Sequence, residues 1–219
     1  MPPRRRKPRY HIVITSGPTR EFLDSVRFIS NPSSGKMGDA LARAAVARGH
    51  QVTLVCGPVC LKDPPGATVV RVTTGAEMLA AAKAAYEDAD AAIFAAAVCD
   101  YRPEKRAAKK LPKQQGRSVI ELRPTPDIAA TLGRVKQQRI NIAFALEDHD
   151  GRRKAEAKLK SKRADAIVLN GPDNLHAGEA LVEFLRKGDD WQSWPAGSKR
   201  RIAGRIIAQL ESMLADAEH

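Results

Sequence analysis

Short, largely apolar runs alternate with longer alanine-rich stretches along this chain, and this alternation constrains the fold more than any other feature. Three runs, His11–Thr15, Gln51–Cys56 and Ala91–Val98, have the length and apolar character of strands that are buried on both faces. Met37–Arg48 and Ala76–Tyr86 have the length and composition of helices. This alternation predicts an α/β fold, with a doubly wound, mostly parallel sheet and helices on both faces.

The rest of the chain continues the pattern and adds a C-terminal hairpin and helix. The further elements that we expect are strands over Thr68–Val72, Val119–Leu122, Asn141–Glu147 and Ala166–Asn170, and helices over Ile128–Lys136 and Arg152–Lys162. The hairpin pairs Leu181–Leu185 with Trp191–Trp194, and the last helix covers Lys199–Ala215. Ligands of doubly wound sheets bind at the carboxyl ends of the strands, so residues that directly follow strands are the candidates for a site.

Length and charge favour one domain with a basic N-terminal arm. The chain has 219 residues, of which 43% are hydrophobic, and this suffices to bury one core. The formal net charge is +12, and the first nine residues carry a cluster of basic side chains. We therefore expect a basic, disordered arm over residues 1–10 and a single α/β domain over residues 11–219. Aromatic residues make up only 5% of the chain, so nucleic acid is an unlikely partner, although the arm keeps that alternative open.

The sequence contains no candidate membrane span. Its most apolar stretch, Ala91–Val98, is far shorter than the roughly 18 residues that a span needs. The basic start is not followed by a long apolar segment, so we expect no secretory signal. Three cysteines, Cys56, Cys60 and Cys99, are too few and too irregularly spaced for a disulfide framework or a zinc site. A reducing, cytoplasmic setting is therefore expected.

The segment Phe28–Gly38 (FISNPSSGKMG) precedes and opens the first expected helix. Two serines, two glycines and a lysine lie within Ser33–Gly38. Small residues at a helix N-terminus expose backbone N–H groups where the helix dipole is positive, which predicts a phosphate site. The alternative is an ordinary helix cap by Ser33 or Ser34. The segment is neither a Walker A motif nor G-x-G-x-x-G, and the turn Thr15–Arg20 before it is by itself uninformative.

Small and polar residues follow two other expected strands. The alanines of Ala95–Arg102 keep the backbone open to a ligand, and Asp100 adds a carboxylate at the end of a buried strand. An ordinary turn aspartate is the alternative. Pro124–Ile128 begins the next expected helix, with Thr125 as the candidate cap and Pro126 at the first helical position.

Basic residues provide further candidates for anion binding. The run Lys109–Lys113 is equally compatible with a mobile loop that binds a polyanion and with a solvated charge run. Lys158 and Lys162 are four residues apart on an expected helix, which places both ammonium groups on one face. Phe144–Glu147 ends the strand that precedes this helix.

Together these stretches resemble the phosphopantothenoylcysteine synthetase family, known alone or as the carboxy-terminal half of a bifunctional flavoprotein of coenzyme A biosynthesis. The resemblance is carried, over residues 12–170, by ITSGPTREFLDSVRFISNPSSGKMGDALARAAVARGHQVTLVCGPV, AAAVCDYRP, the lysine loop, TPDI, and FALE through KSKRADAIVLN. It implies a Rossmann-like fold and a ligase that condenses 4′-phosphopantothenate with L-cysteine. The reaction would pass through an acyl-nucleotide and release pyrophosphate and a nucleoside monophosphate.

The resemblance also implies site residues. The phosphopantothenate site would consist of Asn31, Ala96, Ala97 and Asp100, with Arg27 reaching in from the partner subunit of a homodimer. The nucleotide site would consist of Gly17, Ser33, Gly35, Gly38, Phe94, Ala95, Ala96, Asp100, Lys110, Pro126, Asp127, Ile128, Ala129, Phe144, Lys158 and Lys162. Lys110 is preferred to Lys109 because it lies ten residues after Asp100. Lys110 and Asn31 are the expected catalytic residues: Lys110 stabilises phosphate charge, and the Asn31 amide donates to the acyl carbonyl.

The co-substrate implied by the resemblance is CTP, preferred to ATP and accompanied by Mg²⁺. No FMN is expected, because the matching stretches contain only the ligase half. The residues that hold the metal are not assigned by the sequence. Cys99 would be a nucleophile only if a base lay beside it, and the sequence supplies none nearby.

Several positions depart from the family pattern. Thr125 stands where the family usually has Asn, Lys110–Lys113 replaces a Lys-x-Lys-Lys run, and Leu175–Ala180 bears no resemblance to the Phe-x-x-Asp-x-Asn segment of the family. These departures leave a catalytically weakened relative as one alternative. An NAD(P)-binding Rossmann oxidoreductase is another, although the chain lacks G-x-G-x-x-G after its first strand and a Tyr-x-x-x-Lys pair.

Overall fold

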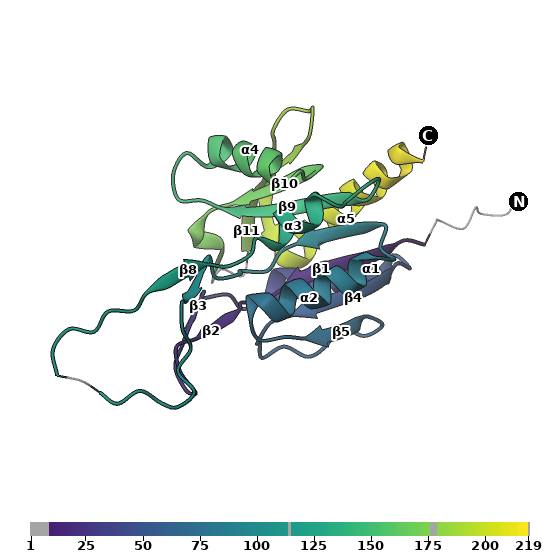
Figure 1. Cartoon of the computed structure of the whole chain (residues 1–219). Coiled ribbons are helices and arrows are strands. Elements are labelled where there is room, and N and C mark those ends of the chain that lie inside the picture. Colours follow the sequence, from purple (N-terminus) through teal and green to yellow (C-terminus); the bar gives the residue numbers. More distant parts are fainter. Residues whose placement is uncertain (1–8, 114, 176–178, 219) are drawn as a thin grey trace, which may run out of the picture.

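The computed structural model describes residues 9–113, 115–175 and 179–218, and its centre is an eight-stranded sheet (Figure 1). In spatial order the strands are β12 (Gln192–Ser198), β11 (Glu179–Arg186), β10 (Ala166–Asn170), β9 (Ile140–Leu146), β6 (Ala91–Phe94), β1 (His11–Ser16), β4 (Gln51–Cys56) and β5 (Thr68–Arg71). The six strands from β10 to β5 are parallel, and the hairpin β11–β12 adds two antiparallel strands at one edge. The strand order reverses between β1 and β6.

Helices cover both faces of the sheet. On one face α1 (Lys36–Ala47) and α5 (Lys199–Ala217) pack on Ile12, Ile14 and neighbouring side chains. On the other face lie α2 (Gly75–Tyr86), α3 (Ile128–Gly133) and α4 (Gly151–Ser161). The predicted doubly wound, mostly parallel sheet with a C-terminal hairpin and helix is therefore confirmed. A 3-10 turn over Pro172–Leu175 follows β10.

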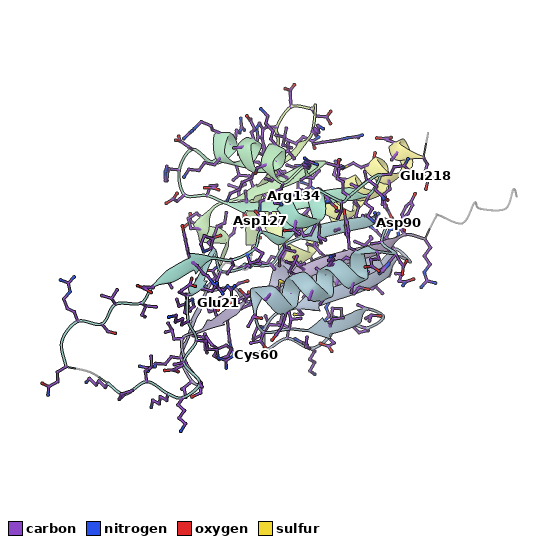
Figure 2. All side chains as sticks on the ribbon, viewed as in Figure 1. Glu21, Cys60, Asp90, Asp127, Arg134 and Glu218 are labelled. Atoms are coloured by element: carbon purple, nitrogen blue, oxygen red, sulfur yellow. The ribbon has the colours of Figure 1, made fainter. Side chains whose placement is uncertain are left out.

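A projection extends from the sheet body and was not predicted. It consists of two short hairpins and the loop 104–121: β2 (Arg20–Phe22) pairs with β3 (Phe28–Ser30), and β7 (Tyr101–Pro103) pairs with β8 (Leu122–Pro124). The loop reaches far from the sheet, and its described side chains are mostly exposed (Figures 1 and 2). At the base of the projection Glu21 is buried, and its Oε1 accepts a hydrogen bond from the Gly75 N–H at 2.8 Å (Figure 2).

Several predicted boundaries were wrong. The strand expected over Ala91–Val98 ends at Phe94, because the following alanines leave the sheet and line a cavity. The strand expected over Val119–Leu122 lies instead at Leu122–Pro124, and Val119 is 88% exposed. The three strands β2, β3 and β7 are too short to give a periodic signal.

The sheet begins at His11, as predicted, but the residue before it already packs on the body. Tyr10, which the sequence analysis assigned to the N-terminal arm, is buried, and its hydroxyl donates to Glu218 Oε1 at 3.0 Å. Burial raises the pKa of this phenol, and the neighbouring Glu218 carboxylate adds to the effect. Residues 1–8, which make up most of the predicted arm, lie outside the described residues.

Candidate functional site

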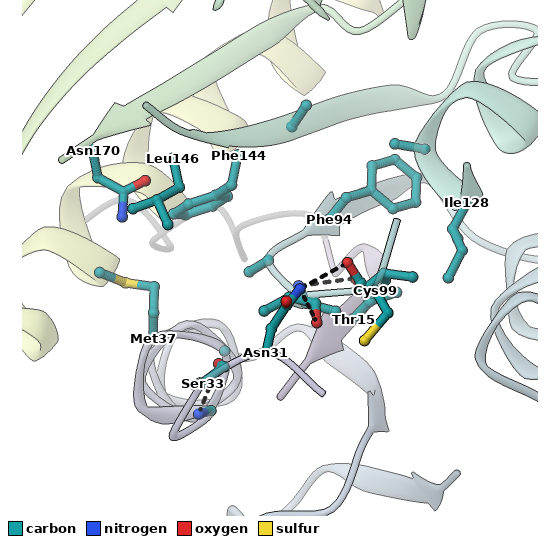
Figure 3. A pocket seen from close by; sticks show the side chains of 18 of the residues that line it. Thr15, Asn31, Ser33, Met37, Phe94, Cys99, Ile128, Phe144, Leu146 and Asn170 are labelled. Atoms are coloured by element: carbon teal, nitrogen blue, oxygen red, sulfur yellow. Dashed lines mark hydrogen bonds between the residues drawn. The ribbon is translucent and has the colours of Figure 1, made fainter. Parts of the chain in front are cut away.

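A cavity of about 510 Å³ lies at the carboxyl ends of the parallel strands, beside the switch in strand order between β1 and β6 (Figure 3). Its walls come from the start of α1, the segment after β6, the start of α3, the inner face of α4 and the ends of β9 and β10. Doubly wound sheets bind ligands in this position because the loops at a switch point diverge and leave a crevice. The cavity is therefore the candidate site.

Sixteen of the predicted site residues line this cavity. They are Asn31, Ser33, Gly35, Gly38, Phe94, Ala95, Ala96, Ala97, Asp100, Pro126, Asp127, Ile128, Ala129, Phe144, Lys158 and Lys162. Gly17, Arg27 and Lys110 do not line it. Residues separated by more than 100 positions in the sequence are thus brought to one crevice.

Gly17 does not line the cavity but contacts a segment that does. Its φ of +76° is strained for residues with a side chain, and a Cβ would lie 2.9 Å from Val59 Cγ1. The Gly17 carbonyl accepts a hydrogen bond from the Ala97 N–H at 2.9 Å. Gly17 therefore positions the backbone of a lining segment.

The start of α1 has no side-chain cap. Its N-cap residue is Gly35, with a φ of +72° and no side-chain hydrogen bond to the first turn. Neither Ser33 nor Ser34 caps the helix, although Ser33 Oγ accepts a weak hydrogen bond from the Gly35 N–H at 3.4 Å. The first-turn N–H groups therefore lack a side-chain acceptor, which suits an anion. A Cβ on Gly38 would lie 2.2 Å from Ser16 Oγ, so glycine allows α1 to approach β1 closely.

Asn31 is held by the segment after β6. Its Nδ2 donates to the carbonyl oxygens of Ala97, at 3.3 Å, and Val98, at 3.0 Å (Figure 3). These two acceptors fix the orientation of the amide, because its oxygen could not face two carbonyl oxygens. Both amide hydrogens are therefore occupied, and Oδ1 is the atom of Asn31 that is left to accept a hydrogen bond from a ligand.

Lys158 of α4 and Lys162, the residue that follows this helix, line the cavity, and each is paired with a carboxylate. Lys158 Nζ lies 2.6 Å from Glu147 Oε1, and Lys162 Nζ lies 2.6 Å from Asp127 Oδ2. Burial tends to raise the pKa of Asp127, but the hydrogen bonds from Lys162 and from the Ala130 N–H hold it below its usual value.

Asp127 also caps α3, and this corrects a predicted helix start. Its Oδ1 accepts from the Ala130 N–H at 2.9 Å, so α3 begins at Ile128 and not at Pro126. Thr125, the predicted cap, instead donates its hydroxyl hydrogen bond to the Cys99 carbonyl. A side chain thereby ties the start of α3 to the segment after β6.

Two lysines of the cavity were not among the predicted site residues, although Lys36 belongs to the segment Ser33–Gly38 that predicted a phosphate site. Lys36 is the first residue of α1 and Lys199 the first residue of α5. Burial lowers the pKa of Lys199, and the nearby charge of Lys36 lowers it further. Lys199 is distant in sequence from every motif. The one signal that could have identified it is its position at the start of a strongly amphipathic helix.

Cys99 has no role as a nucleophile in this arrangement. Its thiol is buried and lies 3.6 Å from the carbonyl oxygens of Thr19 and Ile29. Burial raises the pKa of the thiol, so the reactive thiolate is disfavoured.

Carboxylates are scarce at the cavity. Within the described part of the chain, no group of three or more His, Cys, Asp or Glu side chains could hold a metal ion. Asp100 and Asp127 are the two aspartates of the lining, and Asp127 is engaged by Lys162. Mg²⁺ is often held by one or two carboxylates together with substrate phosphates, and Asp100 fits that donor set.

Arg27 and Lys110 lie on the projection. Asp24 is fully buried there and accepts hydrogen bonds from the N–H groups of Val26, Arg27 and Leu111 and from the Arg27 guanidinium. Arg27 Nη2 also donates to the Leu111 carbonyl at 2.8 Å. The loop residue next to Lys110 is thereby tied to the β2–β3 hairpin, away from the cavity of the same chain.

The fold and the cavity define a class of protein: a doubly wound α/β domain with a crevice at its switch point, lined by an uncapped helix N-terminus and by lysines. Residues 8–214 match the family described as DNA/pantothenate metabolism flavoprotein C-terminal domain. The chain belongs to this family, and its resemblance to the phosphopantothenoylcysteine synthetase family is confirmed.

Three similar proteins illustrate the match. A crystal structure of the C-terminal domain of coenzyme A biosynthesis bifunctional protein CoaBC is 40% identical, with a TM-score of 0.83, and the match covers 94% of this chain and 96% of that one. The CoaBC protein of Bacillus subtilis is 38% identical over 93% of this chain and 51% of its own length. A cysteine/cysteine sulfinic acid decarboxylase from an unknown prokaryotic organism is 41% identical over 93% of this chain and 58% of its own length. The chain thus spans about half the length of these two curated relatives.

No helix in the described residues is long and apolar enough to cross a membrane.

Proposed function

We propose that this chain condenses 4′-phosphopantothenate with L-cysteine, using a nucleoside triphosphate to activate the acid. The observation that carries the proposal is the combination, in one cavity, of an uncapped helix N-terminus, four lysines and a small-residue wall at Ala95–Ala97. The first two features suit a polyphosphate, and the third leaves room for a second ligand beside it. Coenzyme A biosynthesis is also the pathway that the matched bifunctional relatives are named for.

The reaction that we propose has two steps. A carboxylate oxygen of phosphopantothenate attacks the α-phosphorus, the bond from that phosphorus to the bridging oxygen breaks, and pyrophosphate leaves. The cysteine amine then attacks the acyl carbon, the bond to the nucleotide oxygen breaks, the nitrogen loses a proton and the nucleoside monophosphate leaves. Negative charge concentrates on the phosphates in the first step, so cationic side chains of the chain contribute electrostatic stabilisation there.

The sequence suggested that the Asn31 amide donates a hydrogen bond to the acyl carbonyl, but we propose that Asn31 acts as an acceptor in the second step. Because its amide hydrogens bind Ala97 and Val98, its Oδ1 is the group that can orient the attacking amine as a hydrogen-bond acceptor. Asn31→Asp would place a carboxylate against two carbonyl oxygens and displace the segment after β6. We therefore expect this variant to impair both steps, measured as lower pyrophosphate release and lower product formation in rapid-quench experiments. A burst of pyrophosphate with accumulation of the acyl-nucleotide would instead support the donor role.

CTP is the proposed co-substrate, and Asp100 is the residue that would hold the accompanying Mg²⁺. When bound, Mg²⁺ would neutralise phosphate charge. Phe94–Ala96 and Pro126–Ala129 line the cavity, and their backbone groups would suit a small pyrimidine. We expect kcat/KM for CTP to exceed that for ATP. Equal values would point to the divergent segment Gly171–Ala180, part of which lies outside the described residues, as the cause.

A homodimer completes the proposed site. Arg27 and Lys110 lie on the projection, outside the cavity of their own chain, and in the proposed dimer they reach the cavity of the second copy. Exposed apolar side chains on the projection, such as Phe28 and Tyr101, fit such a contact. A cytoplasmic setting and the absence of FMN are parts of the same proposal.

Pyrophosphate release is the assay that tests this function. Purified protein is incubated with phosphopantothenate and CTP or ATP, with and without cysteine. We expect pyrophosphate to depend on phosphopantothenate and the condensed product to depend also on cysteine. No release with either nucleotide would refute the ligase proposal and favour the weakened relative. Binding of NADPH in an absorbance titration would favour the oxidoreductase.

A further inference from the structure

Lys154, a further lysine of α4, contacts the same carboxylate that pairs with Lys158. The helix lies along β9 and β10, and the two lysines are four residues apart on it, so their side chains share one face (Figure 1). Lys158 Nζ lies 2.6 Å from Glu147 Oε1, and Lys154 Nζ lies 3.5 Å from Glu147 Oε2. Lys158 lines the cavity, whereas Lys154 does not. One carboxylate thus connects a lysine of the site to a lysine outside it.

Glu147 depends on these two lysines for its charge balance. Its side chain is only 9% exposed. A carboxylate so far removed from water is stable in its ionised form only while a cation or a hydrogen-bond donor accompanies it. Among the residues that the structure describes, Lys154 and Lys158 are the two partners of this carboxylate. If Lys158 moved away and Lys154 were absent, a buried negative charge would be left unpaired.

The other contacts of Lys154 leave its charge available to Glu147. Its ammonium group can only donate, and it donates to His149 Nε2 at 2.9 Å. Its Nζ also lies 3.8 Å from Asp148 Oδ1, but Asp148 is largely exposed and is already 2.5 Å from His149 Nδ1. Water screens an exposed charge of this kind. Glu147 is therefore both the nearest and the least exposed carboxylate beside Lys154.

The second lysine–carboxylate pair of the cavity differs in this respect. Asp127 pairs with Lys162 at 2.6 Å, and in the described part of the chain no further cation is paired with it. Asp127 is about half exposed, and its Oδ1 also accepts from the Ala130 N–H, so water and this donor can stabilise the charge when Lys162 moves. The additional lysine thus accompanies the carboxylate that is buried.

We propose that Lys154 is a positioning residue of the nucleotide site: when Lys158 leaves Glu147 for a phosphate oxygen, Lys154 neutralises the carboxylate that is left behind. The identity of the ligand as a nucleoside triphosphate rests on the proposed function. Lys154 itself does not have to reach the ligand, because its effect passes through Glu147. This exchange of partners lowers the free-energy cost of releasing Lys158. Lys154 should therefore strengthen nucleotide binding, and only while Glu147 carries its charge.

Isothermal titration calorimetry of the full chain with CTP and Mg²⁺, and with ATP in parallel, tests this exchange. Lys154→Ala should weaken nucleotide binding about tenfold, because release of Lys158 then leaves Glu147 without a cation. Lys154→Arg keeps the charge and should stay within about threefold of the unaltered chain. Lys160→Ala is the matched control, since it removes the same charge from an exposed position of α4 outside the cavity. It should change the affinity by less than about twofold.

The decisive comparison places Lys154→Ala in a chain that already carries Glu147→Gln. Glutamine has the size of glutamate but needs no cation, so in this background Lys154→Ala should change the affinity by less than about twofold. Glu147→Gln alone should bind nucleotide at least as tightly as the unaltered chain, because Lys158 no longer has an ion pair to leave. A general attraction between Lys154 and the ligand would instead give the same loss in both backgrounds.

The outcomes separate this inference from the proposed function. The exchange is overturned by an equal loss in both backgrounds, by unchanged affinity in Lys154→Ala, or by failure of the unaltered chain to bind either nucleotide. A loss of about tenfold in Glu147→Gln also overturns it, because Glu147 would then hold Lys158 in place for the ligand. If the expected coupling is found but no acyl-nucleotide forms, the exchange stands and the ligase proposal fails. If the ligase reaction proceeds without the coupling, the reverse holds. Thermal unfolding of each variant at the temperature of the unaltered chain excludes a folding defect.

Discussion

The sheet body buries most of its apolar side chains, whereas the projection leaves several of them exposed. In the body Phe184 and Ile206 are fully buried, and the helices leave few apolar side chains uncovered. On the projection Val26 is 56% exposed, Tyr101 55% and Phe28 40%. Burial of apolar area is the main force that stabilises a domain, so the body has the contacts to fold by itself. The projection shows the pattern of a surface that another molecule completes.

The two regions also differ in how they are held. The body is held by β-sheet pairing and three apolar clusters. The projection is held largely by one buried carboxylate, Asp24, which accepts hydrogen bonds from N–H groups of the turn between β2 and β3 and of the loop 104–121. Cation–π contacts, Arg20 over Phe28 and Arg106 over Phe22, cover part of its aromatic surface. The body and the projection should therefore respond differently to substitution.

The largest expected effect is on the stability of the body. Phe184 stacks on Trp194 with ring centroids 5.2 Å apart, and Phe184→Ala should lower the free energy of unfolding by about 3–5 kcal/mol. Phe28→Ala, the same substitution on the projection, should change it by less than about 0.5 kcal/mol at low protein concentration. Urea unfolding of both variants measures the two values. Equal losses would mean that the projection is part of the core.

The next effect is on catalysis, if the proposed function holds. Lys110→Ala should lower the rate of pyrophosphate release about a hundredfold, roughly 3 kcal/mol, because a contact to developing phosphate charge is lost. Lys109→Ala, its neighbour on the same exposed loop, serves as the control and should change the rate by less than about threefold. Normal rates in both variants would show that the projection contributes no charge to the reaction.

A smaller effect is expected on association. Phe28→Asp introduces a charge into the exposed apolar surface of the projection, and it should weaken the proposed homodimer about tenfold or more, a change of roughly 1.4 kcal/mol. Val135→Asp introduces the same charge at a position of the body that is 56% exposed, and it should leave association unchanged. Sedimentation velocity over a concentration series distinguishes them. If the unaltered chain is a monomer, formation of a homodimer does not explain why this apolar surface is exposed.

The smallest effect concerns pH. The Arg27 backbone N–H, with the other donors around it, holds the pKa of Asp24 well below its usual value. The folded state stabilises the ionised form of Asp24, which lowers its pKa. The contribution of this carboxylate to stability is therefore fully present above the ordinary pKa of about 3.9. It is lost only as the pH falls through the lower pKa of the folded state. Hydrogen exchange of the Leu111 amide, corrected for intrinsic rates, should therefore show unchanged protection between pH 8 and 5. Loss of protection within that range would contradict the role of Asp24.

The alternation of apolar runs with helical stretches determined the doubly wound sheet, because burial on both faces requires that pattern in a parallel sheet. Local chemistry also placed the start of α1, the alanines after β6 and the spacing of Lys158 and Lys162 correctly among the cavity residues. These features are written in neighbouring residues, so the sequence alone could reveal them. Short strands such as β2 and β7 could not be recognised, because their pairing depends on partners that lie elsewhere in the chain.

What only the tertiary structure decided is which charges are neutralised and which groups are free. The sequence does not show that Glu147 and Asp127 pair with Lys158 and Lys162, that the Asn31 amide is bound to two carbonyls, or that Lys199 lines the same cavity as Lys36. Each of these relations joins residues from separate segments of the chain. Electrostatic and hydrogen-bond energies depend on distance in space, and the folding of the sheet sets those distances independently of separation along the chain.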